Sequence, residues 1–225
     1  YASESLKEST KYAITTPADR KKISPSLSLS YRLLPDDALF FRTMVKSTFR
    51  LPTFNDLYYL QIGNTSLRPE NAVEYGAGLT WNSRKIGAVK YVTATVDAYI
   101  NNVTDKIVAF PSTYIWKMVN FGKVKAKGLD LTLGTQIDLS KGFSLTASGA
   151  MTLQEAKDKT ENSPTYNSQL PYTPKVSGSL SAIFYTPWIN IGYSSTAQVK
   201  RYSMAQNTNE YLMKSYMEHS LSVSR

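Results

Sequence analysis

Hydrophobic and polar residues alternate with a period of two along most of this chain, and the helical period is nearly absent. About nine stretches of roughly 10 to 15 residues show the alternation. The clearest, "VKYVTATVDAYINN", sets Val and Ala at residues 92, 94, 96 and 98 against Thr, Asp and Tyr between them. Successive side chains of a strand point to opposite faces, so each stretch predicts a strand with one apolar face. The pattern predicts an all-β, antiparallel fold.

The surroundings of such a strand are not fixed by its own pattern. In residues 73–81, Val, Tyr, Ala, Leu and Trp form one face, and small or polar residues form the other. A soluble β-sandwich strand has this pattern, with its apolar face in a core. A membrane strand has it too, with lipid outside and a polar lumen inside. Both interpretations stay open at this point.

The lengths of the connections favour the membrane interpretation. Short turns are expected near Asp36, Ser83, Lys141 and Pro187, where proline, glycine or polar pairs interrupt the alternation. Long polar connections are expected in between, after Arg50, Asn102, Leu153 and Lys200. Outer-membrane barrels have short turns at one end and long loops at the other, whereas a sandwich has no need of this rhythm.

Aromatic residues at predicted strand ends agree with a membrane barrel, in which they form girdles at the two interfaces. Aromatic residues make up 12% of the chain, including 16 tyrosines. Soluble strands also favour tyrosine and tryptophan, so this signal is modest by itself. The girdle positions expected are Trp81, Tyr99, Tyr185, Trp188 and Tyr202.

The formal net charge of +9 raises the question of nucleic-acid binding. The basic residues are scattered, and their densest runs are "DRKK" at residues 19–22 and "KVKAK" at residues 123–127. Neither run lies in a recognisable nucleic-acid-binding motif. We therefore expect basic residues on loops and on the polar face, and no nucleic-acid partner.

Candidate catalytic chemistry is sparse. The chain has no cysteine and a single histidine, His219, without a second ligand at metal-binding spacing. The acid pair Asp36 and Asp37 lies in a predicted turn, which explains it better than acid-base catalysis does. We expect no enzyme, no metal site and no cofactor. No run of about 18 apolar residues predicts a transmembrane helix.

The stretch "FRLPTFNDLYYLQIGNTSLRPENAVEYGAGLTW" resembles the barrel signature of TonB-dependent outer-membrane receptors. That signature has an Arg-x-Pro, a leucine-tyrosine turn, a Gly-Asn, a Leu-x-Pro-Glu and then a strand. Later stretches of the chain follow the order of the family, so the resemblance covers nearly all of it. Gly76 and Thr65 depart from the pattern, and Glu74 partly replaces a carboxylate expected at position 76. The matching residues are Arg50, Pro52, Leu57, Tyr58, Gly63, Asn64, Leu67, Pro69, Glu70, Tyr75 and Gly78.

The resemblance implies a plugged barrel of about 22 antiparallel strands in the outer membrane of a Gram-negative bacterium. Residues 1–225 are then one part of a single β-barrel domain, and the plug domain and the closing strands lie outside them. The partners implied are outer-membrane lipid, a nutrient ligand, and an inner-membrane complex that acts through TonB on the plug. A passive porin remains an alternative, but it should lack the Arg-x-Pro to Pro-Glu signature.

The resemblance further implies active uptake of a scarce nutrient. Cargoes of the family include iron-siderophores, haem, cobalamin and glycans, and we expect a metal chelate. Aromatic residues and arginine in long loops are suited to bind a bulky ligand. Arg50 and Glu70 flank the first long loop, and we expect them to pair across its base as a structural contact. The residues expected to bind the ligand are Tyr58, Tyr59, Tyr114, Trp116, Tyr166, Asn167, Arg201 and Tyr202.

Overall fold

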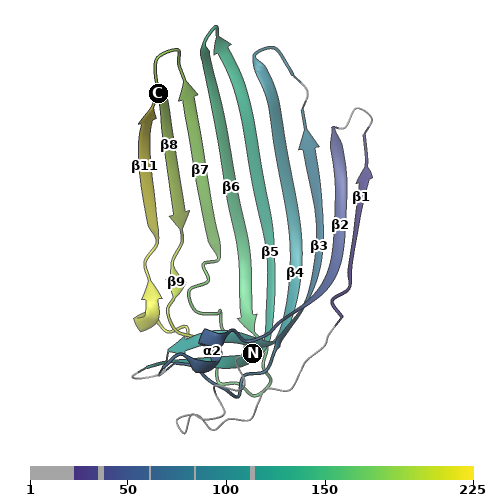
Figure 1. Ribbon diagram of the computed structural model, residues 1–225, viewed down its shortest axis with the longest axis vertical. Helices are drawn as coiled ribbons and strands as arrows, with labels where there is room; N and C mark the ends of the chain where they lie inside the picture. The colour runs from purple at the N-terminus through teal and green to yellow at the C-terminus, as the bar shows by residue number, and fades with distance from the viewer. Residues whose placement is uncertain (1–22, 35–37, 61, 84, 112–114) are drawn as a thin grey trace.

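The computed structural model describes residues 23–34, 38–60, 62–83, 85–111 and 115–225. Nine strands form a single antiparallel sheet in the order β1-β2-β3-β4-β5-β6-β7-β8-β11, which confirms the predicted fold class (Figure 1). A two-stranded ribbon of β9 (Arg201–Tyr202) and β10 (Leu212–Met213) accompanies it. The strands of the large sheet are β1 (Ser26–Arg32), β2 (Leu39–Arg50), β3 (Glu70–Asn82), β4 (Val89–Pro111), β5 (Trp116–Ser140), β6 (Phe143–Asp158), β7 (Val176–Tyr185), β8 (Asn190–Gln198) and β11 (Tyr216–Ser224).

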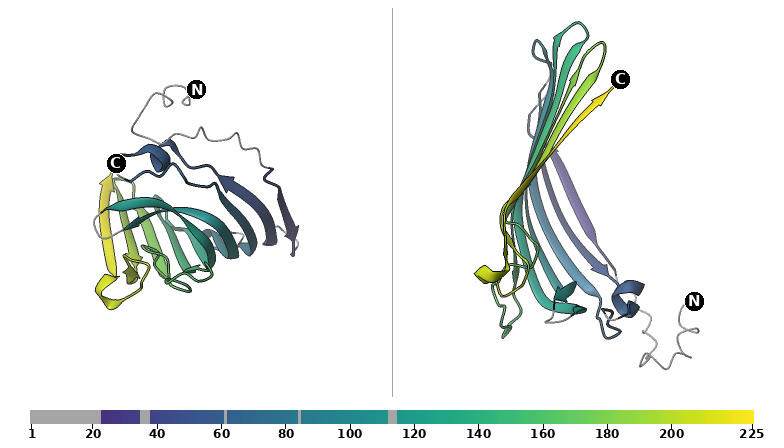
Figure 2. Two further views of the ribbon diagram at one scale, coloured as in Figure 1. Left: turned by 90° about the horizontal axis from the view of Figure 1, so that it is seen from below. Right: turned by 90° about the vertical axis from the view of Figure 1, so that its left-hand side faces the viewer.

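The sheet is one curved layer, seen as an arc of strands in Figure 2. The strand register carries the apolar positions across all nine strands, so that Leu79 is opposite Val96, Val96 is opposite Leu131, and Leu131 is opposite Met151. We call this side the apolar face and the opposite side the polar face. Large side chains of the apolar face are exposed rather than packed against a second sheet. The sandwich interpretation is therefore wrong for these residues, and the face is suited to lipid.

Two ends of the sheet differ in their connections. Short turns follow β3, β5 and β7, at the top of Figure 1, as the sequence predicts; the turn expected near Asp36 lies outside the described residues. Gly142 has the positive φ of 81° that the tight turn after β5 needs. The connections after β2, β4, β6 and β8 gather at the opposite end, which we call the loop end (Figure 1).

The two central strands are longer than predicted. Residues 103–118 were expected to be a loop, but β4 continues to Pro111 and β5 begins at Trp116. The polar residues that suggest a loop lie on a hairpin that extends beyond the neighbouring strands. In this part of β4 and β5, neither face of the hairpin is wholly apolar. Its alternate side chains, Val103 and Val124, are buried against Ala156 and Leu170. The prediction was wrong because burial against other loops, rather than lipid, supports this part of the hairpin.

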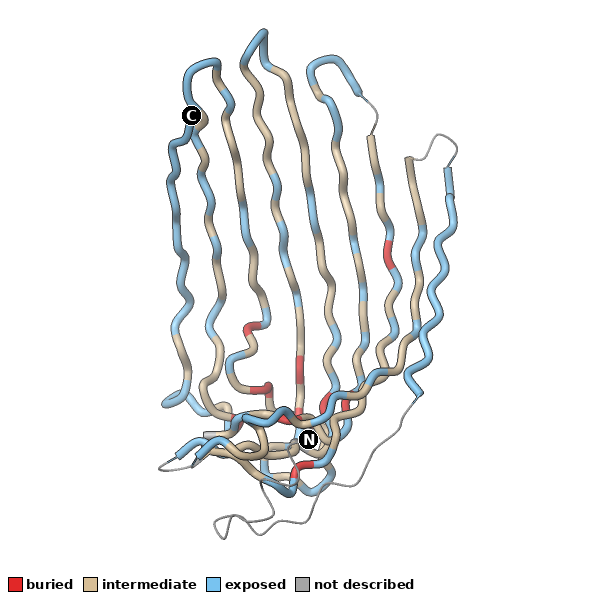
Figure 3. The backbone as a smooth tube through the Cα atoms, in the orientation of Figure 1, coloured by how far each residue is buried: buried red, intermediate tan, exposed pale blue. Residues whose placement is uncertain are grey.

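Buried side chains are concentrated at the loop end (Figure 3). Besides the four residues just named, Leu67, Ile107 and Ala205 are buried there. The loop segments thus have a small core of their own, and the sheet is held mainly by its backbone ladder. No helix in the described ranges is long and apolar enough to cross a membrane.

Three of the expected girdle aromatics are placed differently. Trp81 lies on the apolar face at the short-turn end of β3, as expected. Tyr99 and Tyr185 lie on the polar face, because alternation from Ile100 and Phe184 puts them there. Tyr202 belongs to β9 (Arg201–Tyr202), in the ribbon at the loop end.

Candidate functional site

The first long loop begins with helix α2 (Phe54–Tyr58), and its start is fixed by local hydrogen bonds. The hydroxyl of Thr53 accepts from the backbone N–H of Asp56 at 3.2 Å, and the Asp56 carboxylate accepts from the N–H of Thr53 at 2.9 Å. This reciprocal pair is a capping box, which satisfies donors that the helix start leaves free. The Thr-x-x-Asp spacing after Pro52 therefore sets where the helix begins.

Arg50 and Glu70 pair across the base of this loop, as predicted from the sequence. Their closest nitrogen and oxygen are 3.6 Å apart, and Arg50 is 3.6 Å from Asp56 as well. Glu70 also accepts from the backbone N–H of Ile107 at 3.0 Å and lies 3.5 Å from the Lys106 ammonium. The two charged ends of the family motif therefore join three segments: the end of β2, helix α2 and the β4 extension.

The Gly-Asn step of the motif docks the loop on β5. The side-chain amide of Asn64 donates to the carbonyl of Met118 at 3.0 Å, and the N–H of Met118 donates to the carbonyl of Ile62 at 2.8 Å. A Cβ at Gly63 would lie 2.7 Å from the carbonyl oxygen of Leu57, so only glycine fits. These contacts hold the loop beside the strand that begins at Trp116.

A second group of polar contacts joins Arg68, Asp105 and Asn120. Arg68 pairs with Asp105 at 2.5 Å, and this hydrogen bond raises the pKa of the Arg68 guanidinium. The Asn120 amide donates to the carbonyls of Arg68 and Asp105 at 2.9 and 2.7 Å, and its oxygen accepts from the N–H of Arg68 at 2.8 Å. Arg68 is thus held by both its backbone and its side chain.

Asp158 organises the loop after β6. Its side chain is only 1% exposed and accepts from the Thr160 N–H and from the hydroxyls of Ser163 and Thr165, each at 2.8 Å. Burial raises the pKa of the Asp158 carboxyl, but the hydrogen bonds outweigh burial and leave the pKa below its ordinary value. The carboxylate is therefore a structural acceptor rather than a free binding group.

The loops after β6 and β8 are joined by one asparagine. Asn207, in the left-handed region with φ of 55°, accepts from the N–H of Gln169 at 2.6 Å and donates to its carbonyl at 3.0 Å. A second link runs from the N–H of Tyr172 to the carbonyl of Tyr202 at 2.7 Å. The two loops consequently form one surface.

Two of the expected ligand-binding residues lie on this surface. The ring of Trp116 lies 6.1 Å from the ring of Tyr172, centroid to centroid. Tyr172 has a φ of 56°, an unfavourable conformation for a bulky residue, and is 47% exposed. The backbone carbonyl of Tyr202 accepts from the N–H of Tyr172, and this hydrogen bond connects Tyr202 to the pair of rings. Tyr172 is not among the residues expected from the sequence, although its position between two prolines, Pro171 and Pro174, marks an aromatic held in a rigid turn.

Arg201 lies beside these aromatics in the chain. Its guanidinium carbon lies 5.3 Å from the centroid of the Tyr216 ring, a cation-π distance. One of its terminal nitrogens is buried without a hydrogen-bond partner among the described residues. A buried donor without a partner costs free energy.

The other expected residues lie in two further places. Tyr58 and Tyr59 line a hollow of about 580 Å³ on the α2 segment. The ring centroids of Phe54 and Tyr58 are 4.9 Å apart there. Tyr166 lies under the ammonium of Lys159 at 5.4 Å, and the Asn167 side chain accepts from the same ammonium. Tyr114 lies outside the described residues. The expected set is thus divided among three surfaces of the loop end.

The polar face of β2 to β5 carries charged and aromatic side chains. Arg42 and Asp97 form a bidentate ion pair at 2.8 and 2.9 Å, and a Cβ on Gly78, between them, would collide with the Asp97 carboxylate. Lys46 pairs with Glu74 at 3.1 Å, which places a carboxylate on this face near Gly76. The motif glycine therefore makes room for an ion pair across β3.

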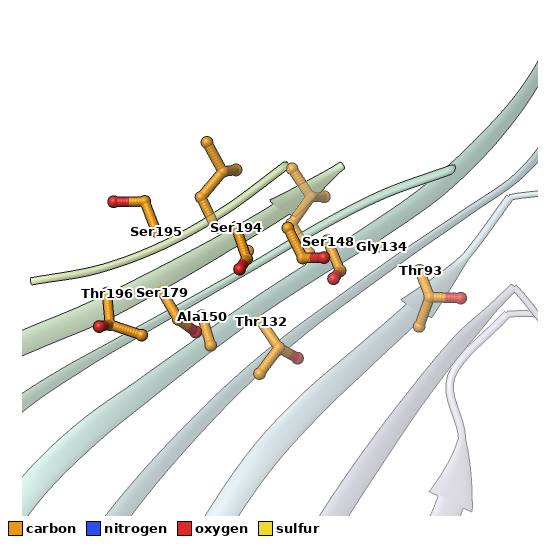
Figure 4. A pocket seen from close by; sticks show the side chains of 13 residues that line it. Thr93, Thr132, Gly134, Ser148, Ala150, Ser179, Ser194, Ser195 and Thr196 are labelled. Atoms are coloured by element: carbon orange, nitrogen blue, oxygen red, sulfur yellow. The ribbon is translucent and has the colours of Figure 1, made fainter. Parts of the chain in front are cut away.

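The polar face of β5 to β8 has a different surface. Small hydroxyl side chains, alanine and glycine make up most of the lining of a shallow hollow of about 430 Å³, which also takes in Leu133, Leu180 and Ser195 from apolar-face positions (Figure 4). Its labelled residues are Thr93, Thr132, Gly134, Ser148, Ala150, Ser179, Ser194, Ser195 and Thr196. Charge and bulk are thus concentrated on one half of the polar face.

The described ranges hold no group of three His, Cys, Asp or Glu side chains placed to bind a metal ion. His219 lies on the apolar face, where its Nδ1 is 2.7 Å from the Tyr193 hydroxyl. The arrangement can bind through aromatic, cationic and hydroxyl groups.

Comparison with known proteins identifies similar chains. The family described as "TonB dependent receptor-like, beta-barrel" matches residues 4–224. The vitamin B12 transporter BtuB of Vibrio vulnificus is 27% identical over 106 residues, which are 46% of this chain and 16% of that protein.

Solved structures share the fold. The copper transporter OprC superposes with a TM-score of 0.65 at 14% identity, over 90% of this chain and 31% of that one. The ferric enterobactin receptor PfeA of Pseudomonas aeruginosa has a TM-score of 0.63 at 18% identity, over 90% and 32%. The ferric citrate transporter FecA has a TM-score of 0.62 at 15% identity, over 89% and 30%. The chain spans about a third of the length of these structures.

Proposed function

Because this chain belongs to the TonB-dependent receptor β-barrel family, we propose that it supplies part of the wall and of the outer loop layer of a receptor for active uptake of a scarce nutrient. The receptor lies in the outer membrane of a Gram-negative bacterium, with its apolar face toward lipid. Its cargo is a metal chelate. The named cargoes of its relatives, ferric enterobactin, ferric citrate, copper and vitamin B12, support this class.

The observation that carries the proposal is the strained Tyr172 beside Trp116. A bulky residue with positive φ costs on the order of 1 to 3 kcal/mol and persists only where the surroundings impose it. Here the imposed conformation holds an exposed ring 6.1 Å from a second ring. Two fixed aromatic rings bind a flat or bulky ligand with little loss of conformational entropy. The guanidinium of Arg201, next to Tyr202 in the chain, adds a cationic group suited to an anionic oxygen of a chelate.

Energy coupling needs a second partner within the lumen. In this proposal the charged half of the polar face, with Arg42, Asp97, Lys46 and Glu74, contacts the plug domain. An inner-membrane complex acts on that plug through TonB and releases the cargo. Ion pairs that are already formed within the wall give the plug a rigid surface to move against.

The test is ligand binding to the complete protein in detergent. The probes are a ferric siderophore, ferric citrate, haem, cobalamin and a copper salt, each titrated by calorimetry. For the probe that binds, the double substitution Trp116→Ala and Tyr172→Ala should raise Kd by roughly 30-fold or more, as expected for paired aromatic anchors.

A matched control is Trp188→Ala, which removes an exposed tryptophan (68% exposed) from the short-turn end. It should leave Kd unchanged. If none of the probes binds, the proposed class of cargo is wrong. If both variants lose affinity equally, the proposed binding surface is wrong.

A further inference from the structure

The outward residues of β5 change abruptly from lysine to leucine. On the apolar face, Lys123, Lys125 and Lys127 follow one another at every second position, and Leu129, Leu131 and Leu133 continue the same row. The three lysines are exposed. In a strand that leaves the hydrocarbon, this change marks the height at which lipid chains give way to headgroups.

Neighbouring strands change at the same height. Across the β5–β6 ladder, Leu129 is opposite Leu153, Lys127 is opposite Glu155, and Lys125 is opposite Lys157. On the other side, Lys125 is opposite Asn102. The boundary therefore continues over three strands at the loop end. We call Lys123, Lys125, Lys127 and Lys157 the lysine patch.

The lysine patch keeps an excess of positive charge. Glu155 lies 2.6 Å from Lys157 and 3.2 Å from Lys127, so one carboxylate is shared by two ammonium groups. Lys123 pairs with Glu161 at 2.9 Å. Lys125 has no ion-pair partner among the residues that the structure describes. Four lysines against two glutamates leave two positive charges on one outward surface.

We propose that the lysine patch binds the phosphorylated headgroup of an outer-leaflet lipid whose acyl chains lie on Leu129, Leu131 and Leu153. A phosphate supplies the missing negative charge between Lys125 and its neighbours. Chains attached to that phosphate extend directly over the leucine row, so one amphiphile satisfies both halves of the surface. Free phosphate would satisfy only the cationic half, which is why the lipid is the occupant that fits.

The proposal rests on the membrane orientation given in the proposed function, but not on its cargo. Basic residues near an anionic membrane surface each contribute about 1 kcal/mol. Removing three should therefore produce a large change in lipid affinity without touching the Trp116 and Tyr172 surface.

The experiment measures binding of a phosphorylated glycolipid, lipid A, and of its dephosphorylated form to the complete protein in detergent. The triple substitution Lys125→Gln, Lys127→Gln and Lys157→Gln should weaken binding of the phosphorylated form by roughly 10- to 100-fold. Arginine at the same three positions should retain binding, which shows that the protein still folds and that charge is what matters. Dephosphorylated lipid A should bind weakly to every variant.

The matched control is Lys117→Gln, Lys141→Gln and Lys214→Gln, which removes the same charge from exposed positions outside the patch. It should leave lipid affinity unchanged. Equal losses in both triple variants, equal binding of dephosphorylated lipid, or displacement by inorganic phosphate at the same concentration as by lipid would each overturn the proposal.

Nutrient binding is measured on the same samples to separate the two proposals. If the lysine triple variant binds a metal chelate normally and loses lipid, both stand. If lipid binding depends on the patch while no chelate binds, only the proposed cargo fails. If a metal chelate binds and the lysine substitutions leave lipid affinity unchanged, only the lipid site is wrong.

Discussion

The sheet and the loop layer of this protein are stabilised in different ways. In the sheet, nine strands are joined by regular backbone ladders, and the large apolar side chains remain exposed. In the loop layer, a few polar side chains hold the segments together. Asn120 and Asn207 each bond several backbone groups of distant segments, Arg50 bonds the carbonyl of Ile107, and Asp158 accepts hydrogen bonds within its own loop. We therefore expect a charge placed on the apolar face to destabilise the sheet most. Loss of a single polar side chain should instead destabilise the loops.

The largest effect is expected on the apolar face. Leu133→Arg places a charge on the apolar face, near the middle of the part of β5 between Lys127 and Ser140, and should lower the free energy of unfolding by about 2 to 4 kcal/mol in lipid vesicles. Thr132→Arg, one residue away on the polar face, should cost less than about 1 kcal/mol, because its charge meets a polar environment. Urea titration of the complete protein in vesicles measures both. Equal costs would contradict the assignment of the two faces.

Loss of Glu70 should give the next largest effect. Glu70→Ala removes the acceptor of the Ile107 N–H and leaves Arg50 and Lys106 without this carboxylate, so we expect a loss of about 2 kcal/mol. Faster hydrogen exchange at Ile107 would locate the damage. Glu161→Ala, which breaks an exposed pair with Lys123, is the control and should change little. A similar loss of stability in both variants would contradict the role of Glu70 in joining the three segments.

Asn207 allows a finer test, because its backbone and its side chain can be separated. Asn207→Gly keeps the left-handed conformation but loses the two hydrogen bonds to Gln169, at an expected cost of about 1 kcal/mol. Asn207→Ala adds backbone strain of roughly another 1 kcal/mol. Hydrogen exchange at the Gln169 amide should become faster in both variants. If the amide stays protected, its protection does not depend on the Asn207 side chain.

The smallest effect at neutral pH concerns Asp158. Its pKa is lowered in the folded protein, so its stabilising contribution is fully present above its ordinary pKa of about 4 and is lost as pH falls through the lower folded value. We expect residues 159–168 to lose order in acid while the sheet persists. Asp158→Asn should abolish this pH dependence, as measured by hydrogen exchange of the Thr160 amide between about pH 5 and pH 2.

The sequence predicts the sheet better than the loop layer. Alternation identifies the strands and assigns side chains such as Asp97 and Leu131 to the correct face, because register and lipid exposure both depend on a local period of two. It fails at residues 103–118, where the hairpin continues beyond the membrane and is supported by Ala156 and Leu170. That support comes from residues far along the chain.

The candidate site shows the same limit. Arg50 and Glu70 were predicted to pair because they flank the same loop, and the β2–β3 ladder places them opposite each other. The contact between Asn207 and Gln169 joins residues 38 positions apart, on either side of strands β7 and β8, and depends on two loop paths. Tyr172 was missed because its exposure and its position beside Trp116 follow from those paths.

Asn207 also has a kinetic consequence. Two loops that share one residue's hydrogen bonds, and that are linked again between Tyr172 and Tyr202, cannot exchange independently. Their opening should have a single rate constant, so the cargo that we propose would slow the opening of both loops by contacting either one. Capture and retention would then be one cooperative event at the mouth of the barrel.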